Sequence, residues 1–245
     1  MNARAKAPLL SLRGITKRFN AVEALVDVDL EVNAHEVVAL VGDNAAGKST
    51  LAKVIAGVLQ PDAGFIEIDG EPVTIPSPGA AHGLGIATVF QDLALCENLD
   101  VTSNIFLGRE LRTGPAIDDA RMENVARGIL RDLTSRIPSV RTPVKALSGG
   151  QRQSVAIART LIGSPRIVVL DEPTAALSVA QTAEVLTHIE RLRELGLGVI
   201  LISHNLNDVR AVADRVEVLR HGRNNGSFPG SEPHETILAA ITGAI

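Results

Sequence analysis

The sequence contains no Trp, no Tyr and a single Cys among its 245 residues, and five Phe are its only aromatic side chains. A lone thiol, Cys96, cannot form an internal disulfide, which fits a reducing compartment. No segment approaches the ~18 apolar residues that a membrane-spanning helix requires. The N-terminal segment also lacks the apolar stretch of a signal peptide. We therefore expect a cytoplasmic protein that would reach a membrane only through other subunits.

The charge balance argues against one class of partner. The formal net charge is −4 at pH 7, with 24 Lys and Arg against 28 Asp and Glu. Because Lys and Arg supply most contacts to nucleic-acid backbones, we expect no nucleic acid partner. Hydrophobic residues make up 45% of the chain, which is ordinary for a globular protein. The shortage of aromatic residues predicts a core built from Val, Leu, Ile and Ala.

Short apolar runs alternate with longer segments of helical periodicity. The runs predict fully buried strands over residues 36–41, 86–90, 166–170 and 198–203. Helical periodicity covers residues 47–58, 119–133, 149–163, 179–194 and 205–213. This alternation predicts an α/β domain whose parallel sheet is covered on both faces.

Two kinds of region depart from the alternation. Residues 8–32 and 64–75 have the polar alternation of antiparallel strands, with a turn at Asp69-Gly70. The segment 92–148 carries several helix signals and no buried strand. We therefore expect a helical insertion within the α/β domain.

Residues 42–49 match the pattern G-x-x-x-x-G-K-[ST] of a phosphate-binding loop, between an apolar strand and a helix as that pattern requires. Consecutive backbone N–H groups and a helix N-terminus bind anions. Lys48 would neutralise the β- and γ-phosphates, and Ser49 would ligate Mg²⁺. A chance glycine-rich turn is the alternative, and correct strand–helix placement makes it rare. The residues predicted to bind ATP here are Gly42, Asp43, Asn44, Ala45, Ala46, Gly47, Lys48, Ser49 and Thr50.

The apolar run 167–170 ends in two acidic residues, Asp171 and Glu172. Both would lie at the carboxyl edge of a parallel sheet, where open sheets bind ligands. Asp171 would hold Mg²⁺, directly or through water, and Glu172 could act as a general base toward the attacking water. Alternatively, both carboxylates would solvate a loop and cap the next helix. The phosphate loop favours the magnesium site.

Residues 147–151 read Leu-Ser-Gly-Gly-Gln and open a helical run. Ser148 is a natural N-cap, and the two glycines leave backbone N–H groups exposed at a helix start; an ordinary capped helix is the alternative. With this motif the chain resembles the ATPase subunits of ABC transporters, whose signature is LSGGQ. The resemblance covers essentially the whole chain. It implies a P-loop NTPase (RecA-like) core with an antiparallel β subdomain and an inserted helical subdomain.

The resemblance also implies an organisation and an assembly. Residues 1–245 would form one domain, with a core and β subdomain over 1–91 and 160–245 and a helical subdomain over 92–159. In that family the signature of one subunit closes over the ATP held by the phosphate loop of another. A head-to-tail dimer with a second copy would follow, in which the residues contacting the partner's nucleotide are Ser148, Gly149, Gly150 and Gln151.

Three further residues take their roles from the resemblance. Phe19 matches the aromatic side chain that stacks on adenine, and the charged residues before it favour stacking over core packing. Gln91 matches the glutamine that reaches Mg²⁺ and the attacking water, its alternative being a surface amide. His204 matches the histidine that hydrogen-bonds the γ-phosphate, although a lone His at a strand end is often structural. Glu172, His204 and Gln91 are thus the predicted catalytic residues.

Two positions differ from the family pattern. Ala45 stands where a second loop glycine is usual, and a positive φ there would cost ~1 kcal/mol or more because of the Cβ atom. Ser178 stands where Asp is common, which removes a carboxylate implicated in communication across the dimer. Neither change removes a catalytic side chain, so we expect an active ATPase.

Residues 86–110 and 42–70 resemble the corresponding segments of bacterial monosaccharide importers of the ribose, xylose and fructose type. This implies membrane permease subunits, an indirect link to a periplasmic sugar-binding protein, and a location on the cytoplasmic face of the inner membrane. Many such ATPases are tandem, so two copies of this chain would supply both sites. The alternatives are a soluble ABC ATPase acting on DNA or ribosomes, which the acidic composition disfavours, and a nucleotide-binding subunit with weak turnover.

Overall fold

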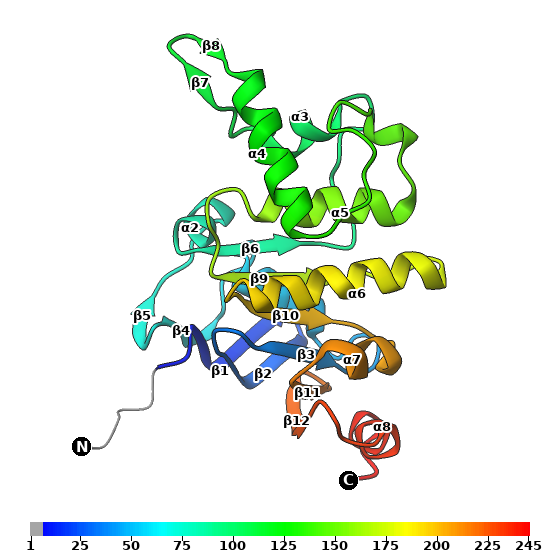
Figure 1. The fold of residues 1–245 in the computed structure, drawn as a ribbon. Coiled ribbons are helices and arrows are strands. Elements are labelled where there is room, and N and C mark those ends of the chain that lie inside the picture. The colour runs from blue at the N-terminus through cyan, green and yellow to red at the C-terminus, as the bar shows by residue number, and fades with distance from the viewer. Residues whose placement is uncertain (1–6) are drawn as a thin grey trace, which may run out of the picture.

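A computed structural model describes residues 7–245 and contains a six-stranded sheet at the centre of the molecule (Figure 1). The strand order is β12-β11-β3-β10-β9-β6, and all neighbouring pairs are parallel except β11 with β12. Every residue of β3, β9 and β10 is buried, as the continuous apolar runs predict. The strands are β3 (Val37–Val41), β6 (Ile86–Val89), β9 (Ile167–Asp171), β10 (Gly198–Ile202), β11 (Arg215–Arg220) and β12 (Arg223–Pro229).

A second, antiparallel sheet lies beside the first. Its order is β2-β1-β4-β5, and all its pairs are antiparallel, which confirms the prediction for the N-terminal and 64–75 segments. Asp69 and Gly70 both have positive φ, 54° and 82°, at the turn before β5, as Asp-Gly hairpins require. The strands are β1 (Leu10–Phe19), β2 (Val22–Val32), β4 (Ala63–Ile68) and β5 (Glu71–Val73).

The inserted segment forms a helical lobe on one side of the central sheet (Figure 1). It contains α3 (Val101–Phe106), α4 (Asp119–Asp132), a short 3₁₀ turn (Val144–Ala146) and α5 (Gly149–Thr160). A small hairpin, β7 (Arg112–Thr113) with β8 (Ala116–Ile117), extends from its tip, where the sequence had suggested helix. The bounds 92–159 for a separate helical subdomain stay a prediction.

Five more helices lie within the described part of the chain, and three of them match predicted segments. They are α1 (Lys48–Ile55), α2 (Pro78–Gly83), α6 (Val179–Glu194), α7 (Leu206–Val212) and α8 (His234–Thr242). The helices α2 and α8 and the strands β11 and β12 were not anticipated. Within residues 7–245, no helix combines the length and apolarity needed to cross a bilayer.

Candidate functional site

The phosphate-loop sequence forms a tight loop between β3 and α1. Gly42 and Gly47 have φ of 151° and 103°. A Cβ atom at Gly42 would lie 2.2 Å from the Leu219 carbonyl oxygen, and one at Gly47 would lie 2.6 Å from the Ala24 carbonyl oxygen. Both positions therefore require glycine for space as well as for dihedral angle. Ala45 is exposed and adopts a φ of 64°. A residue with a Cβ atom is strained in this left-handed conformation.

Lys48 begins α1 and folds back into the loop. Its side chain is buried, with the residue 8% exposed, and its Nζ donates to the carbonyl oxygens of Gly42 at 2.7 Å and Asp43 at 2.9 Å. Burial lowers the pKa of the Lys48 ammonium, and the charges of Glu172 and Asp171 oppose that shift. A partly desolvated cation held against carbonyl groups can exchange them for phosphate oxygens, which are stronger partners.

Asp171 ends β9 and faces the loop with an unpaired acceptor. The residue is 6% exposed, and among residues 7–245 its Oδ1 atom finds no hydrogen-bond donor. Burial raises the pKa of this carboxyl, a hydrogen bond from Ser49 lowers it, and the charge of Glu172 raises it. A buried carboxylate oxygen without a donor suits a hard cation, and the Ser49 hydroxyl beside it supplies a second oxygen ligand. The residues present therefore fit Mg²⁺.

Glu172 and His204 come together although 32 positions separate them. Glu172 Oε2 lies 2.7 Å from His204 Nδ1, and the Glu172 N–H donates to the Ile202 carbonyl at 2.9 Å. Glu172 has φ of 52°, so its backbone departs from the strand and turns its side chain away from that of Asp171. His204 is the more exposed partner, with 68% of its side chain accessible against 16% for Glu172.

The remaining predicted site residues of the nucleotide-binding core are exposed or partly exposed. Gln91 follows β6, the edge strand of the sheet beside β9, and is exposed. Phe19 ends β1, is 42% exposed, and has the Lys17 Nζ 5.8 Å from its ring centroid. Thr50 lies in the first turn of α1. The accessible Phe19 ring can stack on a base.

The signature caps α5 and packs on α6. The Gln151 N–H donates to Ser148 Oγ at 3.3 Å, and the Ser148 N–H donates to Gln151 Oε1 at 3.0 Å, a reciprocal capping box. A Cβ atom at Gly150 would meet the Gln181 side chain at 3.0 Å, and one at Gly149 would meet Leu177 at 3.1 Å. The glycines therefore permit close contact with the chain around Ser178, whose N–H donates to Gln181 Oε1 at 3.1 Å.

Two side chains that the sequence did not single out hold the segment after Gln91. Arg159 on α5 donates to the Leu93 and Ala94 carbonyls at 2.7 and 3.0 Å. Asn104 on α3, fully buried, accepts from the Cys96 N–H at 2.7 Å and donates to the Cys96 carbonyl at 3.0 Å. A polar residue within an apolar helical run was the available signal, but its partners could not be read from spacing.

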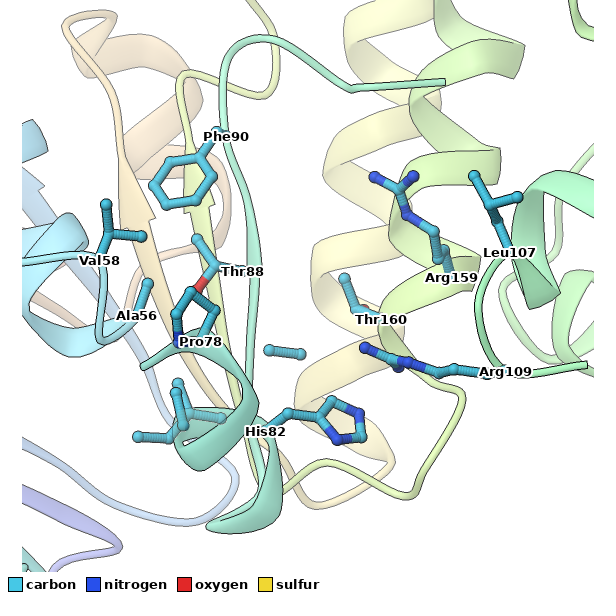
Figure 2. Close-up of a pocket in the computed structure, with 13 residues that line it drawn as sticks. Ala56, Val58, Pro78, His82, Thr88, Phe90, Leu107, Arg109, Arg159 and Thr160 are labelled. Carbon is cyan, nitrogen blue, oxygen red and sulfur yellow. The ribbon is translucent and has the colours of Figure 1, made fainter. Parts of the chain in front are cut away.

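A groove of about 320 Å³ separates the helical lobe from the core (Figure 2). Phe90, Thr88 and Val58 lie on one wall, and Arg109 and Arg159 lie on the opposite wall. Among the described residues, neither arginine forms an ion pair with an acidic side chain. Burial and the charge of Arg109 lower the pKa of Arg159. On the rim, Val58 and Leu107 are 48% and 44% exposed.

Two further cavities flank the phosphate loop on the side of α8. The larger, of about 430 Å³, lies among Asp43, His204, Leu238 and Ile241. The smaller, of about 310 Å³, also includes Ala45 and Ile241. The helix α8, which the sequence analysis missed, is therefore a neighbour of the loop.

The comparisons with known proteins all identify the same family. A family profile described as "ABC transporter" matches residues 25–175. The chain is 46% identical to the xylose/arabinose import ATP-binding protein XylG of Sulfolobus acidocaldarius, across 88% of this chain and 86% of that protein. It is 43% identical to the fructose import ATP-binding protein FrcA of Rhizobium meliloti, across 98% and 96%. A putative ribose/galactose/methyl galactoside import ATP-binding protein of Burkholderia cenocepacia is 42% identical across 99% of this chain, which spans 48% of that relative's length.

Solved structures give the same result at lower identity. A nucleotide-free ATP-binding cassette from an ABC transporter has a TM-score of 0.83 and 26% identity, covering 95% of each chain. A dimeric bacterial ABC transporter cassette has a TM-score of 0.77 and 25% identity, covering 91% of this chain and all of that chain.

Proposed function

The chain belongs to the ABC transporter family, and on that premise we propose that it is an ATP-hydrolysing motor subunit that drives import of a monosaccharide. One observation supports this most strongly: a phosphate loop, a buried carboxylate with an unpaired oxygen, and a Glu–His pair share one edge of the parallel sheet. Each component has a defined task in phosphoryl transfer to water.

The phosphates would be held by the loop and by Lys48. Backbone N–H groups at the start of α1 face the anion, and the helix dipole adds favourable field. The Lys48 ammonium would leave the carbonyls of Gly42 and Asp43 and contact the β- and γ-oxygens. Phe19 would stack on the adenine ring of the bound ATP.

Mg²⁺ would be held by Ser49, Asp171 and Gln91, with phosphate oxygens completing its shell. When bound, the ion neutralises charge that develops on the transferred phosphoryl group. Asp171 contributes through its unpaired Oδ1 atom, whose desolvation the cation would relieve. Ser49 contributes its hydroxyl, which already contacts the Asp171 carboxylate.

Glu172 would accept a proton from the attacking water. Its hydrogen bond with His204 holds the carboxylate in one orientation, so the base is positioned before the substrate arrives. His204 is exposed enough to turn toward the γ-phosphate while remaining beside Glu172. In this role Glu172 is the general base, and His204 stabilises the phosphate.

Ser148, Gly149, Gly150 and Gln151 would act on the nucleotide of a second copy of the chain. Their side-chain hydrogen bonds stay within α5 and its neighbours, as in the capping box of Ser148 and Gln151. The capping box occupies the N–H groups of Ser148 and Gln151, so those of Gly149 and Gly150 would bind an external anion at the N-terminus of α5. The dimeric cassette of similar fold supports a head-to-tail assembly.

A permease would occupy the groove of Figure 2, and this would hold the subunit at the cytoplasmic face of the inner membrane. The apolar rim at Val58 and Leu107 and the two arginines without acidic partners suit a short helix that carries both apolar and acidic side chains. Because a charge left unpaired at an interface is costly, the arginines also select against basic partners. A periplasmic sugar-binding protein would act on the permease from the other side.

The substrate class is supported by the relatives, whose names specify import of xylose or arabinose, fructose and ribose. The test is a phosphate-release assay on the purified chain, followed by co-expression with the permease of its own operon. Leu107→Glu should abolish co-purification with that permease. Leu195→Glu should not, because Leu195 is similarly exposed, at 48% against 44% for Leu107, but lies outside the groove. No phosphate release from either the chain or the complex would refute the motor role.

A further inference from the structure

His188 is a buried titratable side chain that the proposed reaction leaves without a task. It lies on α6 and is completely buried. Its Nε2 atom is 2.7 Å from the Oγ atom of Ser154, which is also completely buried on α5. Figure 1 shows α5 and α6 side by side. The pair therefore joins the signature helix to a helix of the core.

The Ser154 hydroxyl extends this contact to the signature itself. Its Oγ donates to the Gly150 carbonyl at 3.0 Å. A hydroxyl has one proton, so a hydroxyl that donates to Gly150 must accept from His188. The ring proton is thereby assigned to Nε2. Burial lowers the pKa of His188 and so favours a neutral ring, whereas a hydrogen bond with the Leu133 backbone and the charge of Glu184 raise it.

The arrangement constrains the signature more than a helix cap would. A serine that bonds its own i−4 carbonyl bends a helix by an amount that depends on its rotamer, and His188 fixes that rotamer. Gly150 lies on Gln181 of the same helix α6, with space for no Cβ atom at normal contact distance. The Gly150 peptide is thus held on its carbonyl side by Ser154, which contacts His188 of α6, and on its Cα side by Gln181 of α6.

We propose that His188 is a positioning residue for the signature, which acts through Ser154 to set the direction of the N–H groups that bind the partner's nucleotide. The proposal rests on the proposed function, because it assigns the signature to an ATP held by a second copy. His188 and Ser154 are completely buried and belong to neither the phosphate loop nor the proposed Mg²⁺ site of their own chain. Their effect is therefore expected in closure of the dimer and not in nucleotide capture.

The decisive variants are Ser154→Ala and His188→Leu. Each should lower kcat about tenfold, since a small misplacement of a binding group is enough for such a loss, while the Kd for ATP of the isolated chain changes less than twofold. His188→Gln keeps a donor near the position of Nε2 and should retain more than half of the wild-type kcat. The double variant should lose no more than either single variant, as expected for one coupled unit.

Thr187→Ala is the matched control, because the Thr187 hydroxyl makes the same kind of i−4 bond, to Ala183 at 3.0 Å, on the exposed side of α6. A kcat for Ser154→Ala within twofold of this control would overturn the proposal. So would a loss of ATP affinity that parallels the loss of kcat. Ser154→Ala decides alone if His188→Leu does not fold.

A readout without turnover separates this proposal from the motor role. In a Glu172→Gln background, ATP should trap the dimer. There, Ser154→Ala should lower the association constant of the ATP-dependent dimer about tenfold, as determined from the dimer fraction in sedimentation experiments. A wild-type chain that releases no phosphate would refute the motor role alone. An unchanged dimer fraction would refute the positioning role of His188, and no ATP-dependent dimer in that background would refute both.

Discussion

Replacing Ala45 by glycine tests the phosphate loop most directly, because a single Cβ atom is removed from a strained backbone. Ala45 has φ of 64° and is exposed, so its methyl group makes little contact that glycine would lose. We expect Ala45→Gly to raise the melting temperature and to tighten ATP binding. Both effects follow from making the left-handed conformation freely accessible.

The magnitude follows from two opposing terms. A Cβ atom in the left-handed region costs roughly 1–2 kcal/mol, and glycine costs about 0.4–1 kcal/mol through the greater entropy of the unfolded chain. At the midpoints of these ranges the difference is a net stabilisation of about 0.8 kcal/mol, which corresponds to about 2–3 °C in a chain of this length. Where part of the wild-type population relaxes away from the binding conformation, the apparent Kd equals the intrinsic Kd divided by the fraction that remains competent. A two- to fivefold tightening is then expected.

The assays are thermal unfolding without nucleotide and titration with a fluorescent ATP analogue. Ala176→Gly is one control: Ala176 is also exposed with positive φ, 59°, so Tm should rise while ATP affinity stays constant. Ala46→Gly is the opposite control, because Ala46 is 3% exposed, lacks positive φ, and should lose stability. A Tm for Ala45→Gly that falls as in Ala46→Gly would refute the strain argument.

Four further outcomes are expected. Glu172→Gln should lower steady-state phosphate release at least 100-fold, the usual scale for loss of a general base, while ATP binding by titration is retained; near-normal turnover would show that another group accepts the proton. Lys48→Ala should raise the Kd for ATP by tenfold or more because a desolvated charge on the phosphates is lost, and equal affinities would contradict the loop assignment. Asp171 has a pKa raised in the folded chain, so its ionised form opposes folding above that pKa; Asp171→Asn should raise Tm in EDTA at pH 7, with the difference shrinking as pH falls and the wild-type carboxyl protonates, and a lower Tm would contradict the sign. Mixing Lys48→Ala with Ser148→Arg should restore partial activity through one intact site per mixed dimer, and dimers without activity would show that the signature acts in its own chain or that both sites must fire together.

The sequence predicted the central strands, and singled out the residues that the structure brings to one edge of the sheet, because their signals are local. The segments 36–41, 166–170 and 198–203 are mostly apolar and correspond to β3, β9 and β10. Asp171 follows one of these runs directly, and the glycine-rich loop that leads to Lys48 follows another. Strand β12, in contrast, reads Arg-Asn-Asn-Gly-Ser-Phe-Pro and has no strand pattern of its own. It forms by antiparallel pairing with β11 across the short turn at His221 and Gly222, and the polar composition of β12 gave no sign of that hairpin.

Contacts between residues that are far apart in the sequence have no local signal and could not be predicted. Glu172 and His204 were each assigned a role, but their mutual hydrogen bond depends on β9 and β10 being neighbours. His188 was not singled out, since a lone histidine in an amphipathic helix reads as an ordinary surface residue. The positive φ at Ala45 could not be predicted from the residue itself, because alanine gives no sign of a left-handed backbone. The sequence supported only the statement that a positive φ there would be strained.

The position of α8 has a practical consequence for observing this protein at work. Leu238 and Ile241 share a cavity with Asp43 and His204, yet Leu238 is 54% exposed. An environment-sensitive dye attached at position 238 would therefore lie beside the phosphate loop, and its fluorescence would respond to changes there. The substitution would replace no residue that is proposed to bind ATP. With Cys96 exchanged for serine, a cysteine introduced there gives a single labelling site. Its emission would then follow nucleotide arrival, hydrolysis and release in real time, in one subunit of a working assembly.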